Sequence, residues 1–247
     1  INQMLTDALG PLGPLLALGF LGALLVLIAL PALLKKETDG FTKLNGQWCE
    51  SPGSVFVPPH LHDRLVDAIL DRTAEIALGR TDDANTTMGP QANEPQLQRM
   101  RDTVEFLRGV GGTAVSSTPV PDDSGWLFPP TVVHGISSEQ TKSETFGPIL
   151  TVHRASTDEE ALLEANALDT GLAGYVFGAD VDAARELATR IDCGENKINS
   201  TSLLDLDDHS TQSFWGGSGI GAHGDAELLD FFRGSRIIGV DAPGLPL

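Results

Sequence analysis

Hydrophobic positions along this chain follow two periods, one typical of helices and one typical of buried strands. Leu97, Met100, Val104 and Leu107 lie three, four and three residues apart, which is the spacing of one face of an amphipathic helix. Short apolar runs such as residues 173–177 are typical of strands. Because strands and helices alternate, the sequence predicts an α/β fold with a mostly parallel sheet and flanking helices.

The same pattern predicts individual elements from Gly40 onward. Pro58 and Pro59 suit the start of a helix, where no intrahelical donor is lost, and Thr157-x-x-Glu160 is a capping box that begins another. The predicted helices are His62–Leu78, a helix carrying the stripe at 97–107, Thr157–Ala167, a helix with Val181, Ala184, Leu187 and Ile191 on one face, and Asp225–Phe232. The predicted strands are Ser54–Pro58, Trp126–Val133, Ala173–Phe177, Lys197–Asn199 and Arg236–Val240.

A long apolar stretch precedes these elements. No charged residue occurs between Asp7 and Lys35, and a run of about 20 apolar residues can span a bilayer as a helix. Residues 9–34 would then anchor the chain in a membrane, with Lys35 on the cytoplasmic flank. Alternatively, the Gly and Pro residues of the stretch disfavour a helix, and Leu24–Ile28 is a buried parallel strand.

The predicted division of the chain is an apolar segment at residues 1–36, a domain at 37–240 and a tail at 241–247. The first residue is Ile1 rather than Met. The sequence is therefore expected to be a fragment, a processed product or otherwise incomplete.

The charge balance excludes one class of partner. The chain has 34 acidic and 16 basic residues, and its formal net charge is −18. Nucleic-acid binding needs clustered Lys and Arg to pair with phosphates, so no nucleic-acid partner is predicted. The two cysteines lie far apart, which does not indicate a disulfide framework and favours a reducing, cytoplasmic location. The six histidines show no metal-ligand spacing, so no metal site is predicted.

Cys49 is the strongest candidate for chemistry. It ends the run Asn-Gly-Gln-Trp-Cys at residues 45–49, and the apolar run Val-Phe-Val-Pro follows at 55–58. A cysteine on a Gly-containing loop next to a buried strand is well placed to act as a thiolate nucleophile. A lone cysteine is otherwise most often a small buried apolar residue. The motif around Cys49 resembles the nucleophile segment of the aldehyde dehydrogenase superfamily.

Further segments resemble the catalytic domain of that superfamily, in the family's order, between about Gly40 and Val240. The most specific is residues 144–150, Glu-Thr-Phe-Gly-Pro-Ile-Leu, which is similar to the family's Glu-x-Phe-Gly-Pro-Val-Leu motif. The others are Met88-Gly89-Pro90, Phe128–Val133, Asn166–Phe177, Gly194–Asn199 and Phe214–Gly221. Several matches in order are far more specific than one short motif.

The resemblance implies an activity and roles for four residues. Cys49 would attack an aldehyde to form a thiohemiacetal, which NAD or NADP oxidises to a thioester that water releases as an acid. The backbone N–H of Cys49 would stabilise the oxyanion. Glu144 and Phe146 would contact the nicotinamide ribose and ring. Asn199 would line the substrate channel, although a structural Asn at a strand end explains this residue equally well.

The resemblance weakens upstream of Cys49. The family's Glu-Leu-Gly-Gly motif corresponds to residues 17–22, and its glutamate, the general base for thioester hydrolysis, is replaced by Ala17. No Gly-rich phosphate loop follows a predicted strand in this sequence. The family's Rossmann-type cofactor domain is therefore expected to be missing.

Three hypotheses follow. The first is an aldehyde dehydrogenase-like domain that is incomplete or inactive alone, as a truncation, part of a split enzyme or a degenerate paralogue, and that binds NAD or NADP weakly or not at all. Its partners would be an aldehyde, a partner chain or missing N-terminal domain, and copies of itself in a homo-oligomer. The second is a membrane-tethered accessory or scaffold protein. The third is an acylating dehydrogenase, in which a thiol cofactor replaces water and no glutamate base is needed.

Overall fold

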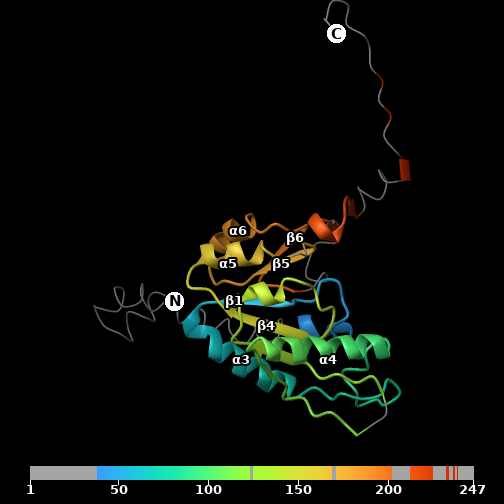
Figure 1. The fold of residues 1–247 in the computed structure, drawn as a ribbon. Helices are drawn as coiled ribbons and strands as arrows, with labels where there is room; N and C mark the ends of the chain where they lie inside the picture. The colour runs from blue at the N-terminus through green and yellow to red at the C-terminus, as the bar shows by residue number, and fades with distance from the viewer. Residues whose placement is uncertain are drawn as a thin grey trace, which may run out of the picture.

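A computed structural model describes residues 38–122, 125–168, 171–201 and 212–224, together with residues 232, 233, 236 and 238. Its largest sheet has four strands in the order β1-β4-β3-β2 (Figure 1). These strands are β1 (Ser54–Val57), β4 (Ile149–Arg154), β3 (Thr131–His134) and β2 (Thr113–Val115). β1, β4 and β3 run parallel, whereas β2 is antiparallel at the edge. The predicted α/β fold with a mostly parallel sheet is confirmed.

Helices pack on both faces of this sheet. α3 (Pro59–Thr73) packs on the face that carries Val132 and Leu150. α4 (Glu94–Gly109) packs on the other face, against Val133 and Ile149, through the predicted stripe of four apolar residues, all of them buried. Neighbouring residues of a strand point to opposite faces, which is why Val132 and Val133 belong to different core clusters.

A second, smaller sheet is the parallel pair β5 (Ala173–Val176) and β6 (Glu195–Ile198). α6 (Val181–Ala188) connects the two strands and packs on them, and α5 (Asp158–Ala165) lies between β4 and β5 in the chain. β7 (Gln212–Ser213) and β8 (Ala222–His223) form a short antiparallel pair. In Figure 1, β5, β6, α5 and α6 lie together at one end of the described region, and α3 and α4 lie toward the other.

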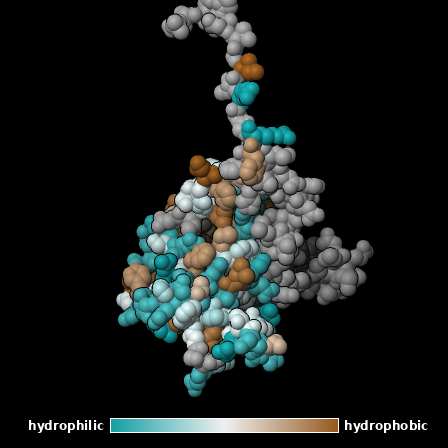
Figure 2. Space-filling view, turned by 90° about the vertical axis from the view of Figure 1, so that its right-hand side faces the viewer, coloured by the Kyte–Doolittle hydropathy of each residue, from teal (hydrophilic) through white to brown (hydrophobic). Residues whose placement is uncertain are grey.

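One face of the described region is mostly hydrophilic (Figure 2). Figure 2 shows a face on which hydrophilic residues predominate and hydrophobic residues are scattered among them. Leu163, for example, is 74% exposed on α5. Single exposed apolar residues are normal on a protein surface, so they do not by themselves indicate an interface.

Several predicted boundaries differ from the observed ones: α3 begins at Pro59 rather than His62, and β6 is Glu195–Ile198 rather than Lys197–Asn199. Two further differences have a local reason. α3 ends at Thr73 rather than Leu78, because Thr118 Oγ1 donates to Thr73 O at 2.6 Å and Leu78 forms a parallel bridge with Met88. The strand predicted from Trp126 begins only at Thr131. Pro129 and Pro130 precede it, and proline has no N–H to donate to a neighbouring strand.

The capping box of α5 is confirmed with one change. Thr157 Oγ1 accepts from Glu160 N at 3.1 Å, but the Glu160 carboxylate accepts from Ser156 N at 2.6 Å instead of from Thr157 N. α5 ends at Ala165 rather than Ala167. The apolar face of α6 is centred on Ala184 and Ala188, and Val181, predicted on that face, is 45% exposed.

Some expectations fall outside the described residues. These are the apolar segment 9–34 with its predicted strand Leu24–Ile28, and nearly all of the helix Asp225–Phe232 and the strand Arg236–Val240. Within the ranges that the structure describes, every helix is too short or too polar to cross a bilayer.

Candidate active site

Cys49 lies on an exposed turn that follows a tightly folded loop. The helical residues 38–42 lead into the 3-10 turn η2 (Lys43–Gly46). Asn45 and Gly46 have φ of 61° and 75°, values that glycine and asparagine adopt more readily than other residues. Two residues after Gln47 the chain turns at Cys49, which is exposed to solvent.

The side chain of Asn45 joins the Cys49 loop to the Met-Gly-Pro turn at residues 88–90. Asn45 Oδ1 accepts from Gly89 N at 2.8 Å, and Asn45 Nδ2 donates to Pro90 O at 3.0 Å. Gln91 Nε2 donates to Asn45 O at 3.1 Å, and Gln47 Oε1 accepts from Ala92 N at 3.0 Å. These four hydrogen bonds hold the chain on the N-terminal side of Cys49.

Gly46 brings the Phe146 segment against the same loop. Gly46 is buried, and a Cβ on it would lie 2.2 Å from Pro148 N and 2.5 Å from the carbonyl carbon of Gly147. Only a residue without a side chain fits this contact. The carbonyl of Phe146 accepts from Gln96 Nε2 at 2.6 Å, which fixes the segment to the first turn of α4. The structure therefore brings together the two most specific sequence motifs.

Glu144 and Phe146 are both exposed on this segment. Phe146 is 39% exposed although the next two residues, Gly147 and Pro148, are buried. Phe146 has φ of 52°, a conformation that costs energy in a bulky residue and is often found at functional sites. The segment presents an aromatic ring and a carboxylate to solvent beside the Cys49 loop.

Asn199 lies directly after β6, also with a positive φ, of 56°. Its Oδ1 accepts from Gly178 N and its Nδ2 donates to Gly178 O, both at 2.9 Å. This pairing ties the end of β6 to the loop after β5. The contact supports the structural alternative for Asn199, and the substrate-channel role stays a prediction.

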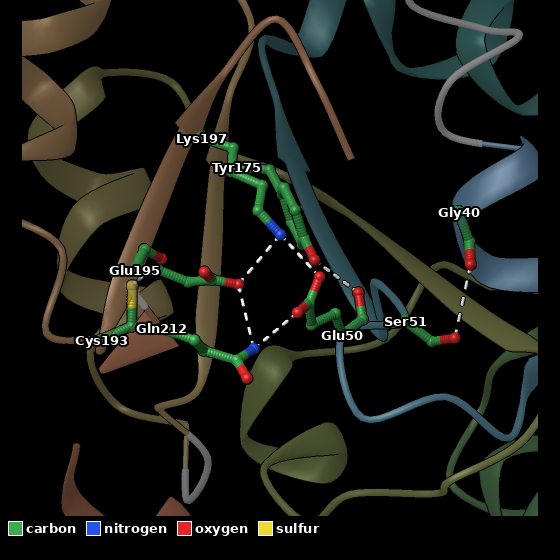
Figure 3. Close-up of polar contacts among 8 residues, drawn as sticks. All are labelled: Gly40, Glu50, Ser51, Tyr175, Cys193, Glu195, Lys197 and Gln212. Atoms are coloured by element: carbon green, nitrogen blue, oxygen red, sulfur yellow. Dashed lines mark hydrogen bonds and ion pairs between the residues drawn. The ribbon is translucent and has the colours of Figure 1, made fainter. Parts of the chain in front are cut away.

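The structure adds a group of residues that sequence reasoning missed, here named the buried charge cluster: Glu50, Glu195, Lys197 and Gln212 (Figure 3). Lys197 Nζ lies 2.6 Å from Glu50 Oε2 and 2.9 Å from Glu195 Oε1. Gln212 Nε2 donates to Glu50 Oε1 at 2.5 Å and to Glu195 Oε1 at 3.3 Å. All four residues are buried or nearly so, and Glu50 directly follows Cys49.

One sequence signal could have found part of this cluster. Glu195 and Lys197 are two residues apart on a short strand, so they lie on the same face of it. Charged residues are almost never fully buried unless they are paired. Two opposite charges on one face of a short strand therefore suggest an ion pair, but nothing local identifies Glu50 as the third member.

The sequence of this chain matches a known protein family over most of its length. The sequence profile described as "Aldehyde dehydrogenase family" matches residues 28–238. The chain belongs to the aldehyde dehydrogenase family. It is 30% identical over 168 residues to a betaine aldehyde dehydrogenase from Brucella anthropi, covering 66% of this chain and 34% of that protein. It is 30% identical over 199 residues to a vanillin dehydrogenase from Corynebacterium glutamicum, covering 79% and 40%.

Solved structures of aldehyde dehydrogenases have the same fold. A mutant aldehyde dehydrogenase from Bacillus cereus superposes with a TM-score of 0.76 at 25% identity, over 81% of this chain and 41% of that one. A mutant betaine aldehyde dehydrogenase from Staphylococcus aureus, solved with NAD+ and a BME-modified cysteine, gives a TM-score of 0.75 at 27% identity, over 81% and 41%. This aldehyde dehydrogenase chain thus spans well under half the length of the relatives that it matches.

The two thiols of this aldehyde dehydrogenase chain differ in environment. Both are free. Burial, then the nearby Glu50 and Glu195 carboxylates, raise the pKa of Cys49, while the backbone N–H groups of Cys49 and Glu50 partly offset this. Burial raises the pKa of Cys193 to about 11, and its Sγ lies 3.1 Å from both Glu195 O and Asn196 Oδ1. Cys49 is therefore the more exposed thiol, but its surroundings do not favour the thiolate.

We expect Cys49 to be alkylated at least about tenfold faster than Cys193 at neutral pH, because the thiolate is the reactive form and Cys49 is exposed. The measurement is a time course with iodoacetamide, with each site quantified by mass spectrometry of peptides. Cys49→Ala provides the control, in which only slow labelling at Cys193 should remain. Equal rates at both sites would show that the assignment of Cys49 as the accessible thiol is wrong.

Other potential ligands do not gather into a metal centre. Over the described ranges, no group of three or more His, Cys, Asp or Glu residues is placed to hold a metal ion. His62, for example, is buried with its Nδ1 2.6 Å from Asp63 Oδ1 and its Nε2 3.3 Å from Val152 O. Both ring nitrogens are thus engaged with protein atoms.

Proposed function

We propose that this chain is the catalytic portion of an NAD(P)-dependent aldehyde dehydrogenase and that Cys49 is its nucleophile. The single observation that carries the proposal is the contact of Gly46 with Gly147 and Pro148. The loop that leads to the exposed Cys49 therefore packs against the segment that carries the exposed Phe146, which supports a shared site for a cysteine nucleophile and an aromatic ring.

The proposed chemistry at Cys49 is addition to a carbonyl group. The thiolate sulfur forms a bond to the aldehyde carbon, and the carbonyl oxygen takes up the negative charge. The backbone N–H of Cys49 is the donor that this chain would direct at that oxyanion, and one missing donor in such a site typically costs about 10²–10³ in rate. Water or another acceptor then cleaves the thioester and regenerates the thiol.

NAD or NADP, when bound, supplies the oxidant that converts the thiohemiacetal to the thioester. The exposed Phe146 ring and the Glu144 carboxylate fit the nicotinamide end of such a cofactor. The N-termini of α4, α5 and α6 suit its diphosphate poorly, because the capping side chains of Asn93, Thr157 and Asp180 each bond at least one first-turn N–H group, and each first turn carries an acidic residue. α3 begins with Pro59, which has no N–H. An anion site needs free N–H groups at such an end.

We therefore expect this chain alone to bind NAD or NADP no more tightly than about millimolar, because the part of the chain that the structure describes offers no phosphate site beside the residues that fit the nicotinamide end. Calorimetric titration of the chain with each nucleotide measures this, and Phe146→Ala is the matched variant for any weak heat observed. A micromolar dissociation constant would show that a diphosphate site exists on this chain.

The experiment that tests the nucleophile is protection by an aldehyde. An aldehyde that adds reversibly to Cys49 should slow alkylation of Cys49 and leave Cys193 unchanged in the same sample. Betaine aldehyde and vanillin are suitable probes, because the similar proteins from Brucella anthropi and Corynebacterium glutamicum are named for them. The corresponding alcohols, which cannot form a thiohemiacetal, are the controls. Alkylation of Cys49 at the same rate with saturating aldehyde would contradict the proposal.

The complete activity of the protein is part of the same proposal. We propose that turnover requires a cofactor-binding domain or partner chain in addition to the described residues, and that the assembled protein is a homo-oligomer. Without these, the chain is expected to be inactive in aldehyde oxidation while still adding aldehydes at Cys49. Whether water or a thiol accepts the acyl group is distinguished by adding a thiol such as coenzyme A to the acylated protein.

A further inference from the structure

Glu50 is anchored at three points although it lies directly beside the exposed Cys49. Its backbone O accepts from Tyr175 Oη of β5 at 2.5 Å. Its carboxylate oxygens contact Lys197 Nζ of β6 at 2.6 Å and Gln212 Nε2 of β7 at 2.5 Å. Glu50 is 2% exposed. The backbone on the C-terminal side of Cys49 is therefore tied to three strands outside the four-stranded sheet (Figure 3).

Asn45 and Gln47 hold the N-terminal side of the same turn, as described above, so Cys49 is restrained from both directions. We propose that Glu50 and Lys197 are positioning residues for Cys49: their ion pair fixes the backbone after the nucleophile, and Lys197 balances the negative charge beside the thiol. The inference rests on the proposed role of Cys49 and specifies how this chain controls that residue.

The charges in the buried charge cluster do not cancel. It contains two carboxylates and one ammonium group, and Glu195 Oε2 is buried without a hydrogen-bond partner among the described residues. The pKa of Glu50 is raised by burial despite the opposing effect of Lys197. Glu50 on the turn and Glu195 on β6 are the carboxylates that act on the Cys49 thiol, and Lys197 on β6 is the cation that contacts both of them.

This arrangement predicts opposite effects for removing the two partners of the ion pair. Glu50→Gln removes a negative charge beside Cys49 and keeps the size of the side chain, so the Cys49 thiolate should form at lower pH. Lys197→Met removes the cation and leaves both carboxylates, so the thiolate should form at higher pH. Loosening of the turn without an electrostatic role would instead move both variants in the same direction.

The experiment is the pH dependence of iodoacetamide alkylation at Cys49, with glutathione as a reference thiol. Below the midpoint of the profile, Glu50→Gln should react about threefold faster than the parent chain and Lys197→Met about threefold slower, as expected for shifts of about half a pH unit. Glu195→Gln should shift the profile in the same direction as Glu50→Gln, by a smaller amount. Shifts of Glu50→Gln and Lys197→Met in the same direction, or no shift in either, would overturn the proposal.

Glu50→Asp keeps the test decisive if Lys197→Met does not fold. Aspartate keeps the negative charge but has a shorter side chain. The pH profile of Cys49 alkylation in Glu50→Asp should therefore lie at higher pH than the profile of Glu50→Gln. Coincident profiles of these two variants would also overturn the proposal. Because alkylation needs neither aldehyde nor cofactor, failure of aldehyde protection would reject the catalytic role of Cys49 while leaving the opposite shifts intact.

Discussion

Replacing Lys197 with methionine is expected to lower the free energy of unfolding by about 3–5 kcal/mol, the usual cost of removing one partner of a buried ion pair. Lys197 contacts both Glu50 and Glu195, and its side chain is 1% exposed. Methionine fills much of the same volume, so the loss comes mainly from two buried carboxylates left without a cation. Urea unfolding at neutral pH, followed by circular dichroism, measures the change.

A matched control is Lys142→Met. Lys142 Nζ lies 2.8 Å from Glu139 Oε1 in a partly exposed pair, and such pairs contribute at most about 1 kcal/mol. Glu50→Gln should also lower the free energy of unfolding far less than Lys197→Met does. In Glu50→Gln the remaining carboxylate of Glu195 is still paired with the ammonium group of Lys197. If Lys197→Met and Lys142→Met lower the free energy of unfolding by the same amount, the buried ion pairs do not stabilise the fold.

Lowering the pH should restore part of the free energy of unfolding that Lys197→Met loses. Burial raises the pKa of Glu50 in the folded chain above its unfolded value, so the folded state binds a proton more tightly. The stability from that proton is present at low pH and is lost as pH rises through the folded pKa. Without Lys197, the free energy of unfolding should depend more steeply on pH. The difference in this free energy between the parent chain and Lys197→Met should therefore become smaller as the pH falls from about 7 to about 5. A difference that stays constant over this range would contradict the account of the cluster.

The second large effect is expected for Gly46→Ala. The residue has φ of +75°, and a Cβ there would lie 2.2 Å from the backbone nitrogen of Pro148. The left-handed conformation costs about 1–2 kcal/mol for a residue with a Cβ, and overpacking typically adds about 1–3 kcal/mol. Because backbone atoms of the Phe146 segment must move, we expect a loss of about 2–5 kcal/mol together with altered alkylation kinetics at Cys49.

Gly53→Ala is the matched control for this change. Gly53 lies just before β1, a Cβ on it would meet no atom within 4 Å, and its φ is not positive. The substitution should change stability by less than about 1 kcal/mol. If Gly46→Ala is as stable as Gly53→Ala in urea, the contact between the Cys49 loop and the Phe146 segment is not as close as described.

The sequence predicted those parts of the site that short segments encode. The stripe on α4, the capping residue of α5 and the strand after Cys49 each depend on spacing within a few residues, and each was found. The Asn-Gly-Gln-x-Cys and Glu-x-Phe-Gly-Pro motifs identified the family, but their contact through Gly46 and Pro148 depends on the fold of the intervening chain.

The buried charge cluster could not be predicted in the same way. Glu50 reads locally as a polar residue in a turn, and Gln212 as part of a polar loop. Their burial follows from packing β6 and β7 against the Cys49 turn, and Glu50 and Lys197 are 147 residues apart. Glu144 and Phe146 differ from the cluster residues, because a sequence motif identified them in advance. Both are exposed, so packing within this chain does not explain why these residues are present.

The most direct test of the central claim, that Cys49 is the nucleophile of an aldehyde dehydrogenase-type site, is acylation by an activated ester. The chain is mixed with p-nitrophenyl acetate at mildly alkaline pH, because burial raises the pKa of the Cys49 thiol, and the product is analysed by intact and peptide mass spectrometry. The account predicts one acetyl group on Cys49, formed with release of p-nitrophenol, and its loss in Cys49→Ala. Acetylation distributed over other residues, or unchanged in Cys49→Ala, would contradict it.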